Sequence, residues 1–336
     1  MTILHQNYPL GIHNSLGFSV AAKFATTITS EDDLRPLFAD QTWQGYPYLA
    51  LGGGSNIVFT KDFPGLVMHI AIRGKRLLKE DTDTWIIEAG AGEIWHDFVS
   101  WTLQQGWPGL ENLALIPGSV GGAPIQNIGA YGIEMAQYCH SVRAYDVHHK
   151  KSVELDIKYC QFNYRDSIFK KNPQRYIITH VRFCLPRHWQ AKLGYAELAQ
   201  ALAHIHHPTP QQLFDAVVAL RSKKLPDPKI LGNVGSFFKN PIISAAQIKN
   251  LSAQFPALPN YPQADGQYKL AAGWLIEQCG FKGCKRDTVG VYEKQALVLL
   301  HFGNGNGQQL LKLAQEIQTS VETRFGVTLE IEPTII

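Results

Sequence analysis

The chain has 336 residues, which is enough for two or three domains at roughly 100–200 residues each. Hydrophobic residues make up 45% and charged residues 18%, a composition that suits packed cores and excludes large-scale disorder. The formal net charge is only +3 and the basic residues are scattered, so a nucleic-acid surface, which needs a basic stripe, is not expected. No apolar run approaches the ~20 residues that cross a bilayer, and the N-terminus lacks the basic and apolar regions of a signal peptide.

Cysteine and histidine patterns predict neither a disulfide framework nor a metal site. The five cysteines are irregularly spaced and contain no CxxC pair, so we expect reduced thiols. The thirteen histidines include no HExxH sequence, and His148 and His149 fall at a predicted hairpin turn. We therefore expect no bound metal.

The first half of the chain is rich in predicted strands. Ser30, followed by three acidic residues, predicts the start of a helix. Residues 48–51 and 57–59 are typical of short strands on either side of a glycine loop, residues 85–87 are strand-like, and Pro64-Gly65 predicts a turn. Apolar residues at helical spacing predict a helix over 92–105 that ends at Gly106.

The second half mixes strands and helices. Residues 141–159 and 175–185 are β-rich, and Thr209-Pro210-Gln211-Gln212 predicts a helix running to about Lys223. Residues 269–279 are predicted to be helical and 296–301 to form a buried strand. An amphipathic helix over 308–325 would turn inward Leu310, Leu311, Ala314, Ile317, Val321 and Phe325. Residues 327–332 predict a final strand, and the change in character places a domain boundary within 186–226.

The stretch IPGSVGGAPIQNIGAYG (116–132) is unsuited to a helix or a central strand, because five of its residues are glycine and two are proline. Such a segment favours a backbone laid closely against a ligand, with free N–H groups that bind an anion or the polar edge of a ring.

The loop GGGSN (52–56) lies between two predicted strands rather than before a helix, so it is neither a Rossmann fingerprint nor a P-loop. A tight turn and a pyrophosphate cradle both remain open for it.

Two further segments carry polar groups suited to chemistry. Arg165, next to Tyr164, could bind a carboxylate, although a surface pair with Asp166 is the simpler alternative. Ser236 is followed by two phenylalanines, which suits a hydroxyl in a dry pocket, or it is a turn residue. No GxSxG sequence surrounds it, which argues against hydrolase chemistry.

Together these segments resemble the UDP-N-acetylenolpyruvoylglucosamine reductase family, flavoenzymes of bacterial peptidoglycan precursor synthesis. The matching motifs follow the family's order and span nearly the whole chain: LGGGSNIVF (51–59), IPGSVGGAPIQNIGAYG (116–132), NYRDS (163–167), KLPDPK (224–229), GSFFKNP (235–241) and LEIEP (329–333). The segment AKLGYAEL (191–198) is similar to the family type that carries a substrate-capping tyrosine loop.

The resemblance implies an α+β fold. Residues 1–187 would form an FAD-binding region of the vanillyl-alcohol oxidase (PCMH) type, in two subdomains split near residue 67. Residues 188–225 would form the tyrosine loop and a linker helix, and 226–326 a smaller α+β substrate-binding domain. Residues 327–336 would be a final strand returning to the FAD-binding part. The 52–56 loop contains no histidine for covalent attachment, so noncovalent FAD is expected.

The resemblance also implies a reaction and its residues. NADPH would reduce FAD, and flavin N5 would deliver hydride to C3 of the enolpyruvyl group of UDP-N-acetylglucosamine enolpyruvate. Ser236 would protonate C2, Arg165 would hold the carboxylate and Glu332 would support the enolate. The implied cofactor-binding residues are Gly52, Gly53, Gly54, Ser55, Asn56, Pro117, Gly118, Ser119, Gly121, Gly122, Gln126, Asn127, Gly129 and Ala130. The implied substrate-binding residues are Tyr164, Tyr195, Lys224, Asn240, Tyr261, Lys269 and Gln295.

The last motif departs from the family pattern, which commonly ends Leu-Glu-Pro-Glu-Val. Its spacing from Leu329 selects Glu332 as the catalytic carboxylate, while Glu330 lies on the same predicted face and stays an alternative.

Two other functions remain open from the sequence. An FAD-dependent sugar or alcohol oxidase of the same superfold would not need Ser236, Arg165 and Glu332. A catalytically silent nucleotide-binding regulator is disfavoured because all three residues are present. The resemblance further implies a small-molecule substrate, no nucleic-acid or membrane partner, a monomer and a cytoplasmic location.

Overall fold

The computed structural model describes residues 3–40, 43 and 45–336. The chain folds into two compact units, each assembled from three segments of sequence. Unit 1 comprises Met1–Pro9, Ala21–Gly54 and Phe63–Lys223, and unit 2 comprises Leu10–Val20, Ser55–Asp62 and Lys224–Ile336. Each unit has its own buried core.

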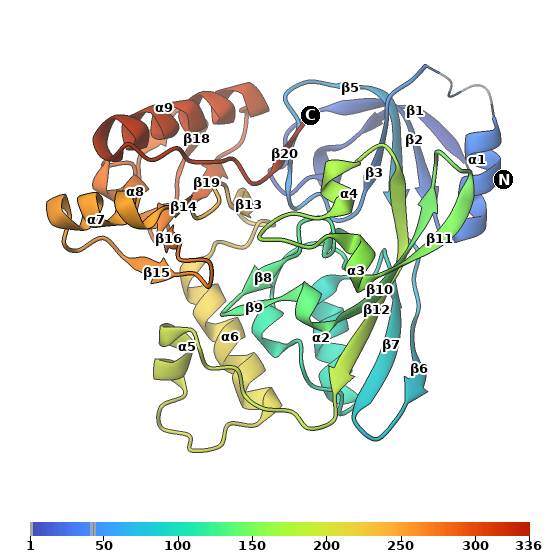
Figure 1. The fold of residues 1–336 in the computed structure, drawn as a ribbon. Coiled ribbons are helices and arrows are strands. Elements are labelled where there is room, and N and C mark those ends of the chain that lie inside the picture. The colour runs from blue at the N-terminus through green and yellow to red at the C-terminus, as the bar shows by residue number, and fades with distance from the viewer. Residues whose placement is uncertain (1–2, 41–42, 44) are drawn as a thin grey trace. The chain divides into compact units, whose positions relative to one another are not determined.

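The first sheet of unit 1 is mostly parallel (Figure 1). Its order is β1 (Leu4–Pro9), β2 (Ala21–Ile28), β5 (Phe63–Ile70) and β3 (Tyr48–Leu51), with β1 antiparallel to β2 and the other pairs parallel. The 3-10 turn Glu31–Asp33 leads into α1 (Leu34–Ala39). Ser30 begins this turn with the predicted cap, since its N–H donates to the Asp33 carboxylate at 2.9 Å.

The second sheet of unit 1 is antiparallel, in the order β11 (Lys151–Asp156), β10 (Cys139–Asp146), β12 (Tyr176–Pro186), β7 (Thr84–Gly90) and β6 (Lys75–Glu80). Ile177, Thr179, Val181 and Phe183 of β12 are all buried, since alternate residues of a strand face the same side of the sheet. His148 and His149 occupy the turn between β10 and β11, which confirms the predicted hairpin.

Helices complete unit 1. The predicted helix is α2 (Trp95–Gln104), whose Trp95, Phe98 and Val99 enter the core. The others are α3 (Ile157–Cys160), α4 (Ile168–Lys171), α5 (Ala196–Ala201) and α6 (Pro210–Lys224). Thr209 begins α6 with a reciprocal cap, because its Oγ accepts the Gln212 N–H at 3.2 Å and the Gln212 side chain accepts the Thr209 N–H at 2.9 Å. Short 3-10 turns lie at Glu111–Leu113, Val120–Gly122 and Met135–Tyr138, and the hairpin of β8 (Gly129–Ala130) and β9 (Ile133–Glu134) separates the last two.

Unit 2 contains two small antiparallel sheets. The first has the order β13 (Gly232–Ser236), β19 (Val298–His301), β18 (Val289–Val291) and β17 (Lys285–Arg286). The second has the order β14 (Ile242–Ile243), β16 (Tyr268–Leu270) and β15 (Asn260–Pro262). The helices are α7 (Ala245–Gln254), α8 (Ala272–Gln278) and α9 (Gly307–Phe325), and the strand β4 (Ile57–Val58) pairs in parallel with β20 (Thr334–Ile335).

The helix α9 is the predicted amphipathic helix. Asn306 caps its start, and Gly326 ends it with a left-handed φ of 63°. The predicted inward residue Leu311 is partly buried and packs against the core, and Leu313, which was not predicted to face inward, is fully buried. The buried side chains are otherwise those at the predicted positions.

The segment Leu10–Val20, which includes a 3-10 turn at Gly11–His13, is fixed inside unit 2 by buried polar side chains. Asn14 Nδ2 donates to the carbonyls of Leu10 at 2.8 Å and Phe18 at 3.2 Å. His301 Nδ1 lies 2.7 Å from the Leu16 carbonyl, and its Nε2 accepts the Gly305 N–H at 2.9 Å. This segment is therefore held by residues almost 300 positions away in sequence.

Three sequence predictions were wrong in detail. Pro64-Gly65 lies inside β5 instead of forming a turn, because the neighbouring Leu66 N–H pairs with the Pro47 carbonyl at 2.9 Å. Residues 327–332 are extended but form no strand, with a single isolated bridge between Ile331 and Phe238. The region 269–279 divides between β16 and α8, so its helix begins only at Ala272.

Candidate functional site

The two glycine-rich segments of unit 1 lie against each other. A Cβ added to Gly53 would sit 2.9 Å from Gly118 Cα, and one added to Gly52 would sit 2.4 Å from Ser119 Oγ. Gly54 and Gly118 have left-handed φ angles of 59° and 115°. A side chain at either approach would force the segments apart, so glycine serves close backbone contact here.

The same loop presents unused backbone donors. Within the part of the chain that the structure describes, the N–H groups of Gly53 and Gly54 pair with no protein acceptor. Unused N–H groups on adjacent residues are suited to binding an anion such as a phosphate. The fit of this loop to a pyrophosphate therefore rests on the close approach and on these donors together.

The beginning of the 116–132 stretch packs against the region between β7 and α2. Gly121 N–H donates to the Ala91 carbonyl at 2.8 Å, and a Cβ on Gly121 would sit 2.5 Å from Ala91 Cβ. Ser119 forms an isolated bridge with Ile94. Gly122 N–H returns to the Ser119 carbonyl at 3.0 Å. Gly121 is therefore required for packing, whatever its relation to a cofactor.

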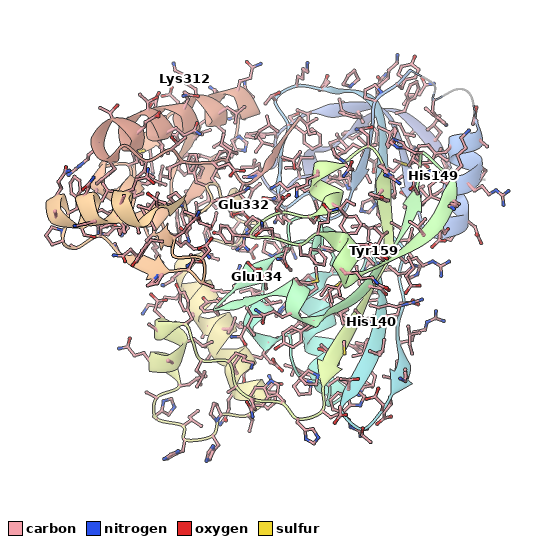
Figure 2. The ribbon with its side chains drawn as sticks, viewed as in Figure 1. Glu134, His140, His149, Tyr159, Lys312 and Glu332 are labelled. Atoms are coloured by element: carbon pink, nitrogen blue, oxygen red, sulfur yellow. The ribbon has the colours of Figure 1, made fainter. Side chains whose placement is uncertain are left out.

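Asn127 is buried and its side chain is committed within the protein. Its Nδ2 donates to Glu134 Oε2 at 2.8 Å and to the Asn163 carbonyl at 3.1 Å, while its Oδ1 accepts the Ala136 N–H at 2.9 Å. Figure 2 shows Glu134 on β9, the second strand of the hairpin. The side chain of Asn127 thus holds the hairpin within the protein.

Arg165 is attached to the same hairpin. Its Nη2 donates to the Gly129 carbonyl at 2.7 Å, its Nη1 lies 3.5 Å from the Asn127 carbonyl, and its Cζ is 5.3 Å from the centroid of the Tyr164 ring. The backbone at Arg165 is left-handed, with φ 53°. The structure therefore brings the predicted carboxylate-binding arginine to the predicted cofactor stretch.

Two neighbouring residues were not predicted from the sequence. His96 Nδ1 accepts the Leu115 N–H at 3.0 Å, and Arg221 Nε donates to the Leu115 carbonyl at 3.3 Å. Burial lowers the pKa of His96, and it also lowers the pKa of Arg221, which lies near Tyr131 and Arg165. The two side chains fix the residue that precedes the glycine-rich stretch, and Arg221 adds a second cation close to Arg165.

Tyr195 lies at the other end of this stretch. Its ring contacts the Tyr131 ring edge-to-face, with centroids 5.0 Å apart and planes at 77°. Its side chain is exposed, and the residue precedes α5. The structure thus places the predicted capping tyrosine beside the glycine-rich stretch within unit 1.

Ser236 and Glu332 lie on adjacent segments of unit 2. Ser236 is the last residue of β13 and follows Gly235, whose φ is 72°. The carbonyl of the next residue, Phe237, accepts the Glu332 N–H at 3.0 Å. The prediction of a dry pocket for Ser236 was wrong, because its side chain is exposed while Phe237 and Phe238 turn inward to the core.

The two carboxylates near the chain end, Glu330 and Glu332, differ sharply in their exposure to solvent. Glu332 is 9% exposed, on the segment that leads into β20 (Figure 2). The Glu330 side chain is 70% exposed and forms an ion pair with Lys239. The predicted alternation would have placed both on one face. Burial beside the Ser236 strand therefore favours Glu332 over Glu330 as the candidate.

Four other predicted substrate residues of unit 2 lie near the start of α8. Tyr261 and Lys269 are directly opposite each other in the β15–β16 pair. Asn240 Oδ1 accepts the Ala272 N–H at 3.0 Å, and Gln295 Oε1 lies 2.9 Å from where a Cβ of Gly273 would be. Lys224 is the last residue of α6 and the first of the C-terminal segment of unit 2. Ser55 and Asn56 belong to unit 2, whereas Pro117, Gln126 and Ala130 belong to unit 1.

The residues that the structure describes have neither a metal-binding cluster nor a membrane-spanning helix. All five cysteines are free thiols, and these residues include no group of three or more His, Cys, Asp or Glu side chains that could hold a metal ion. None of their helices combines the length and apolar character needed to cross a membrane.

Two parts of the chain match known family models. Residues 227–336 match the family model for the UDP-N-acetylenolpyruvoylglucosamine reductase C-terminal domain, and residues 22–150 match the FAD binding domain model. A UDP-N-acetylenolpyruvoylglucosamine reductase from Paraburkholderia xenovorans is 54% identical over 331 residues, which cover 97% of this chain and 96% of that protein. The enzyme of that name from Ralstonia nicotianae is 53% identical over 342 residues, covering 100% of both chains.

Among solved structures, the UDP-N-acetylenolpyruvylglucosamine reductase of Thermus caldophilus matches 100% of this chain and 98% of its own, with a TM-score of 0.66 and 21% sequence identity. This match shows a shared fold. Together with the two family models it confirms the predicted α+β class, an FAD-binding fold followed by a second domain. From its identity to relatives along their full length, the chain belongs to the UDP-N-acetylenolpyruvoylglucosamine reductase family.

Proposed function

We propose that the protein is an NADPH-dependent flavoenzyme that reduces the enolpyruvyl group of UDP-N-acetylglucosamine enolpyruvate to give UDP-N-acetylmuramate. The observation that carries this proposal is the close contact between Gly52-Gly53 and Gly118-Ser119, with unused N–H groups beside it. The FAD binding domain model spans both segments, and the relatives bear the name of this reductase.

Noncovalent FAD fits the donor set of unit 1. The N–H groups of Gly53 and Gly54 would bind its pyrophosphate, and the 116–132 stretch would lie along its ring system. When bound, the reduced flavin supplies a hydride to C3 of the enolpyruvyl group. Arg165 is positioned on the β8–β9 hairpin, and its guanidinium would hold the substrate carboxylate, where negative charge develops as C3 gains the hydride.

Ser236 would complete the reduction by donating its hydroxyl proton to C2. Its exposed side chain allows water to return that proton after each turnover. Glu332 lies on the adjacent segment, and its carboxyl group, in the protonated form, would support the enolate. Tyr164, Tyr195, Lys224 and Asn240 would bind the substrate, mainly at its diphosphate. Tyr261, Lys269 and Gln295 would add further contacts from the region around α8.

The test separates the two half-reactions. Ser236→Ala should keep the reduction of bound flavin by NADPH while slowing flavin reoxidation by the enolpyruvyl substrate about 10²–10⁴-fold, because only the second step needs a proton at C2. Stopped-flow absorbance of the flavin measures both steps. Ser244→Ala, at an exposed serine that caps α7 in the same unit, is the matched control. Normal reoxidation in Ser236→Ala would refute the role of this serine.

A further inference from the structure

One buried amide joins the glycine-rich stretch to the tyrosine loop, which we define as residues 187–195 between β12 and α5. Asn112 is 1% exposed, and its Nδ2 donates to the carbonyl of Lys192 at 2.9 Å and to that of Tyr131 at 3.0 Å. Lys192 belongs to the tyrosine loop and Tyr131 to the glycine-rich stretch. The two hydrogens of a single amide therefore tie two segments that are distant in sequence.

The preceding residue lies against the same loop at a second point. Glu111 is also 1% exposed, its carboxylate accepts the Gly109 N–H at 2.7 Å, and the Trp189 side chain of the loop lies near that carboxylate. Glu111 and Asn112, consecutive in one 3-10 turn, thus face the loop at Trp189 and hold it at Lys192.

Packing holds the tyrosine loop on one side. Trp189, Ala191 and Leu193 are partly buried and pack against the core of unit 1, whereas no residue of 187–195 is fully buried and the first buried side chain after the loop is Leu198 in α5. A cavity of about 270 Å³ lies against the loop, lined by Tyr138, Trp189 and Lys192 among others. These apolar contacts are partial, so the buried hydrogen bonds of Asn112 add a directional constraint on where the loop backbone lies.

The contacts that Glu111 and Asn112 make with the tyrosine loop and the glycine-rich stretch, which we call the anchor, extend to Tyr195 through Tyr131. Asn112 holds the Tyr131 carbonyl, whose residue has a left-handed φ of 49°, and the Tyr131 ring contacts Tyr195 edge-to-face. We propose that Glu111 and Asn112 are positioning residues that set the place of Tyr195 over the substrate. This inference rests on the proposed function, in which Tyr195 contacts the substrate.

Substitutions at Asn112 test the anchor. Asn112→Asp keeps the shape but points a carboxylate oxygen at two carbonyl oxygens, and Asn112→Leu removes both donors without adding charge. We expect either change to raise KM for the enolpyruvyl substrate about tenfold, the size expected for losing one or two net hydrogen bonds. FAD content and the rate of flavin reduction by NADPH should stay as in the unmodified protein. Trypsin should cut after Lys192 faster, with no substrate present.

The matched control is Asn14→Asp. Asn14 is likewise buried and donates to two backbone carbonyls, but in unit 2. It should lose comparable stability without changing KM or cleavage of the tyrosine loop. Trp189→Phe removes the indole N–H beside Glu111 from the loop side, so it tests the anchor even if substitutions at position 112 prevent folding. It should also speed cleavage and raise KM.

The outcomes separate this inference from the proposed function. Folded Asn112 and Trp189 variants with unchanged KM and unchanged cleavage would overturn the anchor, as would equal effects in Asn14→Asp. FAD loss with a normal KM after FAD is resupplied would show that Asn112 supports only the glycine-rich stretch, which also overturns it. If the unmodified protein does not turn over the substrate, the proposed function fails, while the cleavage assay still decides whether Glu111 and Asn112 hold the loop.

Discussion

Strained backbone gathers at the candidate site of unit 1. Non-glycine residues with left-handed φ there are Leu115 (57°), Asn127 (45°), Tyr131 (49°) and Arg165 (53°). Each such residue costs about 1–3 kcal/mol and persists only where its surroundings determine it. Every one of them is held by at least one side-chain hydrogen bond: Leu115 by His96 and Arg221, Asn127 by its own amide, Tyr131 by Asn112 and Arg165 by its own guanidinium.

His96 gives this strained backbone a pH dependence. Its Nδ1 can accept the Leu115 N–H only when that nitrogen is unprotonated, and burial holds the pKa of His96 below its ordinary value of 6.5. A histidine with a lowered pKa in the folded state contributes stability above pH 6.5. That contribution is lost as the pH falls, because the unfolded chain then binds the proton more readily.

His96→Asn should therefore make the free energy of unfolding less dependent on pH. The asparagine oxygen can still accept the Leu115 N–H but does not titrate. Urea unfolding between pH 8 and pH 5 would measure the free energy of unfolding of both proteins. The unmodified protein should lose more stability than the variant below about pH 6.5. His13 and His180 also have lowered pKa values but are common to both proteins, so parallel profiles would contradict the role of His96.

The residues that hold the site were harder to predict than those that could touch ligands. Ser236 and Arg165 were chosen within local motifs, whereas Asn112 acts on Lys192, which is 80 positions away, and Arg221 acts on Leu115, which is 106 positions away. A buried asparagine has no local pattern that distinguishes it from an exposed one. Spacing from Leu329 had selected Glu332, but the difference in burial that favours it over Glu330 was not predicted, because strand alternation placed both on one face.

At the scale of elements, glycine marks where two segments touch. The loop 52–54 and the turn at Gly118-Ser119 come from different parts of unit 1, and their contact leaves no space for a Cβ on Gly53. Because the proposed pyrophosphate site is formed by this loop, its shape depends on the contact.

Gly53→Ala should weaken FAD binding while leaving unit 1 folded. Overpacking of this kind costs about 1–3 kcal/mol, so the FAD affinity should fall by about one to two orders of magnitude. Titration of the FAD-free protein with FAD, followed by flavin fluorescence, measures the change. Gly11→Ala is the matched control, since its added Cβ would meet only the Phe18 carbonyl at 3.8 Å. Equal affinities for the two variants would contradict the proposed cradle.

Elements with a strong local signal were predicted well, and those defined by distant partners were not. The helix over 92–105 and the one over 308–325 have caps or stops and apolar spacing that act within one segment. Pro64-Gly65, in contrast, has the composition of a turn. A Cβ on Gly65 would sit 1.8 Å from the Pro47 carbonyl oxygen, so this glycine lets the Pro47 backbone approach the strand closely. Residues 327–332 alternate like a strand but pair with Phe238 at only one bridge.

At the scale of the whole molecule, the two units do not follow the order of the sequence. The segments 10–20 and 55–62 interrupt unit 1 in sequence but belong to unit 2. Leu16, Phe18 and Val58 are buried in the core of unit 2 with residues such as Val234 and Leu299. Hydrogen bonds join the same segments to the C-terminal part, including Asn233 N–H to the Ser15 carbonyl at 3.1 Å and Thr60 N–H to the Ile336 carbonyl at 2.7 Å.

Native-state hydrogen exchange should reveal this interleaving. Peptides from 10–20 and 55–62 should open with those from 224–336, and not with their neighbours in sequence, because cooperative opening follows shared cores. FAD at about 100 times its dissociation constant should add ~2.7 kcal/mol to the state that binds it, which slows exchange about a hundredfold. We expect the largest slowing in the core of unit 1, including β7 and β12. If residues 10–20 instead exchanged together with β1 and β2, the division of the chain into these two units would be contradicted, since the contacts of Asn14, Leu16 and Phe18 would not govern their opening.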